Sequence, residues 1–182
     1  MSDRQIVLDS GRDRPTWWTE NNESNPTLIA AQILAQKGHD VRIDQEAIDQ
    51  KGRPLPGRIV INGSDEGKNL LNQLINTPEL NALAGAVFHL WEPATNQCSQ
   101  WEEQTRRKVL ALYWQNKALF EKKQSEEAQS IDSGEYRKGL AQENQRKAES
   151  ILGELEPLTA DQIRSLVEQA ANNFLRQSSI TS

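Results

Sequence analysis

Residues 25–44 read NPTLIAAQILAQKGHDVRID and contain the clearest secondary-structure signal of the chain. Asn25 followed by Pro26 is a typical helix start, because Asn caps the free amides and Pro suits the first helical turn. Gly38 after a basic residue is typical of a helix end. HDVRI at 39–43 then predicts a strand. We therefore expect a helix that leads directly into a strand.

A short apolar run, QIVLD at 5–9, precedes this helix and predicts a first strand. Strand, helix and strand in this order are typical of a βαβ unit with a right-handed crossover. RIVIN at 58–62 predicts a third strand. AVFHLW at 86–91 predicts a fourth, with the end of a helix as the alternative for that run. The sequence thus predicts an α/β or α+β fold with a small sheet of three to four strands and flanking helices.

The composition changes in the second half of the chain. Residues 97–129 contain no Gly or Pro and are rich in helix formers. A second helix is expected at about 140–152, and an amphipathic helix after Thr159, which begins a capping box. We therefore expect a small α/β domain at 1–95 and a helical hairpin or bundle at 96–182, either separate or packed as one unit.

The charge and the cysteine content limit which cellular compartments and which ligands are expected for this protein. The formal net charge of -5 argues against a general affinity for the backbone of DNA or RNA. The single cysteine, Cys98, cannot form an internal disulfide, which favours a reducing compartment. The N-terminus has no signal-peptide pattern, and no apolar run approaches the roughly 18 residues that span a bilayer. We expect a soluble, cytoplasmic protein that does not associate with membranes.

Acidic residues at the ends of predicted strands form the first candidate site. Asp9 ends the first strand, Asp40 begins the second, and Asp65 follows the third. Ligand sites of parallel sheets lie beyond the carboxyl ends of the strands, so Asp9 and Asp65 could hold Mg²⁺ or Mn²⁺. The alternative is that Asp65 serves the dipole of a helix and Asp9 caps a turn.

KGHDV at 37–41 and INGSDEGKNLL at 61–71 resemble acidic-site nucleases of the PIN and NYN type. Those enzymes pair an Asp at the end of the first strand with Asp residues after later strands. The resemblance implies a metal-dependent nuclease or phosphoryl-transfer enzyme with Asp9, Asp40 and Asp65 as catalytic residues. The spacing between Asp9 and Asp40 is shorter in this sequence than in that fold.

Basic and aromatic side chains form a second candidate site, because together they can bind phosphates and stack on bases. Its basic members are Arg12, Arg14, Arg106, Arg107 and Lys108. The tandem Trp17 and Trp18 follow the first two of these. The simpler alternative is that the indoles fold back onto the core and the basic residues line a solvated helix face.

The third candidate is a protein-binding surface, which the sequence favours. The predicted helices carry more apolar surface than a small sheet can cover, although a hairpin packed onto the sheet would also account for it. The aromatic candidates for this surface are Trp17, Trp18, Trp101, Trp114, Phe120 and Phe174. Without a recognisable active-site motif, we expect a non-catalytic accessory or assembly subunit, without a cofactor, that binds another protein subunit or itself. The metal-dependent enzyme and a nucleic-acid-associated subunit remain as alternatives.

Overall fold

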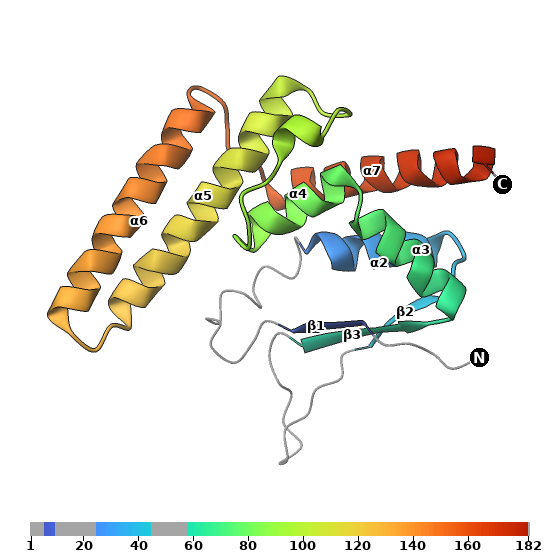
Figure 1. Ribbon diagram of the computed structural model, residues 1–182, viewed down its shortest axis with the longest axis horizontal. Coiled ribbons are helices and arrows are strands. Elements are labelled where there is room, and N and C mark those ends of the chain that lie inside the picture. Colours follow the sequence, from blue (N-terminus) through green and yellow to red (C-terminus); the bar gives the residue numbers. More distant parts are fainter. Residues whose placement is uncertain (1–5, 10–24, 45–57, 182) are drawn as a thin grey trace, which may run out of the picture. The chain divides into compact units, whose positions relative to one another are not determined.

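The computed structural model describes residues 6–9, 25–44 and 58–181, and helices predominate among them (Figure 1). In chain order the elements are β1 (Ile6–Asp9), α2 (Pro26–Gln36), β2 (Val41–Asp44), β3 (Arg58–Gly63), α3 (Asp65–Ile75), α4 (Pro78–Val87), the 3-10 turn η2 (Thr95–Gln97), α5 (Glu103–Glu126), α6 (Ile131–Leu152) and α7 (Ala160–Thr181). Their contacts divide the chain into two compact units. One consists of Met1–Leu80 with Ala160–Ser182, and the other of Asn81–Thr159.

The predicted α/β or α+β class is wrong, because the fold is helix-rich and the strands of its small sheet pair only antiparallel. The strands lie in the order β1-β3-β2, so β3 separates the two strands that α2 connects. β3 runs antiparallel to both of its neighbours. The expected βαβ unit pairs its two strands directly in parallel, whereas here β3 lies between β1 and β2 and runs antiparallel to both of them.

The predicted fourth strand at 86–91 is also wrong. α4 continues through Val87, and the chain then turns with His89 at a positive φ of 44°. The amide of Leu90 donates to the carbonyl of Gly85 at 3.1 Å, which is the bond that closes a helix C-terminus. The apolar run is therefore the buried last turn of a helix, together with the turn that ends it.

The first unit has a core of helices on one face of the sheet. Asn25 caps α2 by accepting hydrogen bonds from the amides of Thr27 and Leu28, and Gly38 follows the helix at a φ of 92°, so the predicted helix is confirmed. α2 contacts β2, α3 and α7, and α2 and α3 lie over the same face of the sheet (Figure 1). Since α7 packs on α2, this unit contains the C-terminal helix, unlike the predicted part at 1–95.

The second unit is dominated by a hairpin of α5 and α6, which run antiparallel and share the most extensive contact of the described elements (Figure 1). α5 also contacts η2. The Asn116 side chain donates to the carbonyls of Ala86 and Val87 at 3.1 and 3.0 Å, and so satisfies two carbonyls at the end of α4. Within the described ranges, no helix is both long enough and apolar enough to cross a membrane.

Candidate functional site: an open groove on the α5–α6 hairpin

An ion pair joins the two helices of the hairpin near its tip. Arg137 of α6 contacts the Glu121 carboxylate of α5 at 2.9 Å. The Glu121 side chain is only 10% exposed, whereas that of Arg137 is 38% exposed. A buried carboxylate needs such a partner, because an isolated charge loses its hydration without compensation. The pair therefore fixes how α5 and α6 face each other.

Hydrogen bonds from side chains to backbone close both ends of the hairpin. Near the tip, the Ser125 hydroxyl donates to the carbonyl of Gly134 at 2.8 Å. At the other end, the Arg107 guanidinium donates to the carbonyls of Ile151 and Leu152 at 3.0 and 3.3 Å. These carbonyls belong to the last turn of α6 and have no partner within the helix. These hydrogen bonds therefore join α5 and α6 near both ends of the hairpin.

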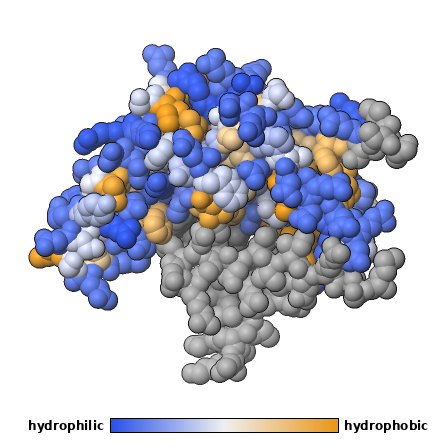
Figure 2. All heavy atoms as spheres, in the orientation of Figure 1, coloured by the Kyte–Doolittle hydropathy of each residue, from blue (hydrophilic) through white to orange (hydrophobic). Residues whose placement is uncertain are grey.

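An open groove of about 990 Å³ runs along one flank of this hairpin. Its apolar members are Ala118, Leu119, Ala128, Ile131 and Ala141. Its charged members are Lys122, Glu126, Glu135, Lys138, Arg146 and Glu149. Leu119 is 52% exposed and Ile131 is 84% exposed, although both are large apolar side chains. Figure 2 shows a hydrophobic patch at the hairpin tip on a mostly hydrophilic surface.

Of the six predicted aromatic candidates, the four that the structure describes do not line the groove. Trp101 is buried, whereas Trp114, Phe120 and Phe174 are partly buried. Phe120 lies against the His89 ring at 4.9 Å between centroids. Trp17 and Trp18 lie outside the described residues.

Trp114 lies between two lysines. The Nζ atom of Lys147 is 3.8 Å from the centre of the Trp114 ring, and that of Lys117 is 5.1 Å from it. Such cation–π contacts are typically worth about 0.5–2 kcal/mol each. The Tyr113 ring meets the indole edge-on at 4.9 Å. These contacts give Trp114 a role in joining α5 to α6.

Two of the predicted basic residues make backbone contacts. Arg106 donates through Nε to the carbonyl of Cys98 at 3.2 Å, and Arg107 caps α6. No contact of the half-buried Lys108 side chain is recorded within the described part of the chain. Arg12 and Arg14 lie outside the described residues. The two arginines therefore have a structural use, and binding of nucleic acid by this set stays a prediction.

We expect Arg107→Ala to lower the free energy of unfolding by about 1–2 kcal/mol, because two carbonyls at the end of α6 lose a charged donor. Urea denaturation followed by circular dichroism measures the change. Lys108→Ala is the matched control, with an expected change below about 0.5 kcal/mol. Equal losses in both variants would contradict the capping role of Arg107.

The predicted carboxylate pair of Asp9 and Asp65 is not brought together. The antiparallel register places Asp9 opposite Arg58, the first residue of β3, whereas Asp65 follows the last residue of that strand. At about 3.3 Å per residue, the length of β3 separates them by roughly 20 Å. No group of three or more metal-binding side chains occurs in the residues that the structure describes. The parallel sheet on which the metal-site alternative depends is therefore not formed.

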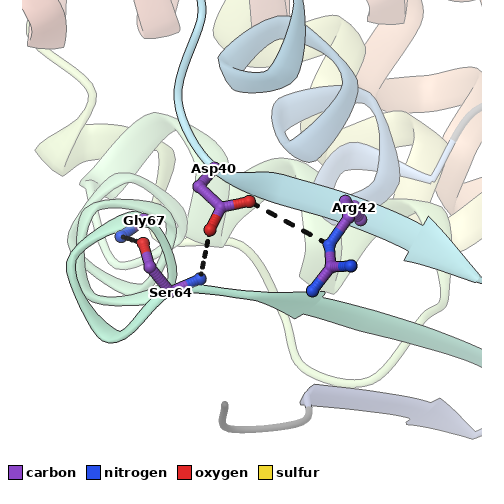
Figure 3. Close-up of polar contacts among 4 residues, drawn as sticks. All are labelled: Asp40, Arg42, Ser64 and Gly67. Atoms are coloured by element: carbon purple, nitrogen blue, oxygen red, sulfur yellow. Dashed lines mark hydrogen bonds and ion pairs between the residues drawn. The ribbon is translucent and has the colours of Figure 1, made fainter. Parts of the chain in front are cut away.

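Asp40 lies at the Asp65 end of the sheet and joins β2 to the start of α3 (Figure 3). Its carboxylate accepts a hydrogen bond from the amide of Ser64 at 3.1 Å. The Ser64 hydroxyl in turn accepts one from the amide of Gly67 at 3.1 Å and caps α3. Arg42 approaches the Asp40 carboxylate at 4.0 Å at an exposed position, where an ion pair contributes little. Asp40 thus has a structural role that the sequence pattern did not indicate.

The groove itself was not among the predicted sites. Most of its side chains are small, polar or charged, so they resemble an ordinary solvated helix face in the sequence. The one available signal was Ile131, a large apolar residue directly after the Ser130 cap of α6. Comparison with protein-family models, curated proteins and solved structures finds no match for this chain.

Proposed function

We propose that this chain is a non-catalytic assembly subunit that binds a partner protein through the groove of the α5–α6 hairpin. The observation that supports this role most directly is the exposure of Leu119 and Ile131 on the groove. When a partner covers a large apolar side chain, the free energy of the complex falls by roughly 25 cal/mol for each Å² of apolar surface removed from water. Exposed apolar side chains gathered along one groove are typical of interaction sites.

The length of the groove favours a protein segment over a small molecule. Its lining on α6 extends from Ile131 to Glu149. At 1.5 Å per residue this distance is about 27 Å, which is the length of a helix of about 18 residues. Two antiparallel helices with an open groove along their flank offer the surface onto which another helix packs in bundles.

We propose that the protein binds its partner in a reducing compartment, the cytoplasm. Cys98 carries the one thiol of the sequence, and its side chain is fully buried. A buried thiol of this kind behaves as a small apolar side chain and does not need an oxidising environment.

A site-specific cross-link tests the proposal. Ile131→Cys places a reactive thiol in the groove, and Tyr136→Cys places one at a position that is 67% exposed and does not line the groove. Because Cys98 is buried, a benzophenone maleimide should label only the introduced cysteine. After illumination in native extract, we expect a defined protein adduct with Ile131→Cys and none with Tyr136→Cys. Identical adducts, or no adduct, with both variants would contradict binding in the groove.

A further inference from the structure

We propose that the protein bound in the groove is a second copy of this chain. The inference rests on the proposed function, because it names the occupant of the same groove. Its basis is the order of charges in the part of the groove near the hairpin tip, whereas Arg146 and Glu149 line the part farther from the tip. Lys122 and Lys138 form a basic row across it, and Glu126 and Glu135 form an acidic row one helical turn nearer the hairpin tip.

The contacts across the hairpin define the basic row. Arg137 of α6 pairs with Glu121 of α5, so these two residues lie at the same height along the hairpin. Lys122 and Lys138 are the next residues in sequence after Glu121 and Arg137, and because the two helices run antiparallel they lie about 3 Å apart along the hairpin. Both line the groove, one from each helix. The basic row therefore crosses the groove slightly obliquely, with Lys122 nearer the hairpin tip than Lys138.

The acidic row is defined in the same way. The Ser125 hydroxyl donates to the Gly134 carbonyl, which brings these two residues to one height. Glu126 and Glu135 follow them directly in sequence, and both line the groove. On α5 the two rows are four residues apart, which is about 6 Å along the helix.

The four charges of the two rows are available to a partner. All four side chains are exposed. Lys122 and Glu126 lie four residues apart on α5, and Glu135 and Lys138 lie three apart on α6, yet neither spacing has produced an ion pair. Within the described ranges, no hydrogen bond or ion pair is recorded for any of the four.

This order is complementary to itself. A two-fold axis can lie in the interface, perpendicular to the helices and midway between the two rows. It places a second hairpin face to face with the first, and the helices of the two copies then run antiparallel. The basic row of each copy then faces the acidic row of the other, so both rows of both copies find opposite charges. A two-fold interface must be self-complementary in this sense, and opposite charges across it favour both encounter and register.

The apolar side chains of the groove are also arranged to fit this two-fold axis. Leu119 of α5 and Ala128, two residues after the end of that helix, lie on either side of the charged rows, five and four residues from the point midway between Lys122 and Glu126. On α6, Ile131 and Ala141 are related in the same way. The two-fold axis therefore sets each large side chain against an alanine of the second copy. Large against small is the arrangement by which packed helices interdigitate.

Charge reversal and sedimentation velocity test the inference. An all-acidic variant carries Lys122→Glu and Lys138→Glu, and an all-basic variant carries Glu126→Lys and Glu135→Lys. We expect the wild-type protein to sediment as two chains, more weakly at high salt. Each variant alone should dimerise at least about tenfold more weakly, because like charges then face each other. An equimolar mixture of the two variants should recover the dimer.

Two further proteins serve as controls. A variant with all four substitutions keeps the net charge and exchanges the two rows, so it should dimerise within about threefold of wild type. Tyr136→Ser, outside the groove, should leave the dimer unchanged. Circular dichroism confirms that each variant is folded.

A wild-type protein that remains a single chain at all concentrations would overturn the inference. A dimer that is indifferent to both charge reversals would overturn it equally. If Ile131→Cys still cross-links a different protein in extract, the proposed function stands and only the identity of the partner is wrong. If the groove cross-links nothing in extract or in purified protein, both proposals fail.

Discussion

Arg137→Met is expected to lower the free energy of unfolding by about 3 kcal/mol, which makes it one of the most damaging single changes in the second unit. The substitution keeps the length of the side chain and removes its charge. The Glu121 carboxylate, which is 10% exposed, then remains between α5 and α6 without its partner at 2.9 Å. A buried charge without compensation destabilises the folded state more than the loss of the pair's own attraction. Urea denaturation followed by circular dichroism measures the loss.

A double variant separates the buried charge from the packing of the hairpin. Glu121→Leu together with Arg137→Met replaces the pair by two apolar side chains, and such replacements are often neutral or stabilising. We therefore expect the double variant to recover most of the stability lost by Arg137→Met alone. Arg164→Met, at an exposed position of α7, is the matched control and should change the stability by less than about 0.5 kcal/mol. A double variant as unstable as the single one would show that Arg137 acts through packing.

The sequence predicted those elements whose signals are local. Asn25 caps α2 through amides two and three residues away, as the pattern indicated. Strand pairing depends on contacts distant in sequence, and the position of β3 between β1 and β2 has no local signature. The prediction of a strand at 86–91 was wrong because apolar, β-branched and aromatic residues also occur at a buried helix end.

The sequence led us to expect a protein-binding site on the helices, but not the residues that line the groove. The expectation of a protein-binding surface on the helices remains a proposal, and those of the chosen aromatic residues that the structure describes do not line the groove. Trp114 lies against Lys117 and Lys147, and Trp101 is buried. A helical periodicity shows that a residue belongs to a stripe, but not whether a neighbouring helix covers that stripe. Only the packing of α6 on α5 reveals which flank is left open.

Gly67→Ala is expected to destabilise the first unit by about 3 kcal/mol. A Cβ atom at position 67 would overlap the carbonyl oxygen of Asp40 and lie 3.0 Å from its carbonyl carbon. These are backbone atoms, so no side-chain rotation relieves the overlap. The start of α3 must move away from the link between α2 and β2. That movement would break the hydrogen bonds from the Ser64 amide to the Asp40 carboxylate and carbonyl, at 3.1 and 3.3 Å.

The matched control is the same substitution at a glycine with free space. Gly139 lies in α6, and a Cβ there would meet nothing within 4 Å. Gly139→Ala should therefore raise the free energy of unfolding by about 0.5–1 kcal/mol, because alanine favours a helix interior over glycine. Hydrogen exchange then locates each effect, with faster exchange in β3 and α3 for Gly67→Ala and slower exchange in α6 for Gly139→Ala. If Gly67→Ala proved as stable as the wild type, the close approach of Asp40 to α3 would not be a required contact of the fold, and Asp40 would lose the structural role assigned to it.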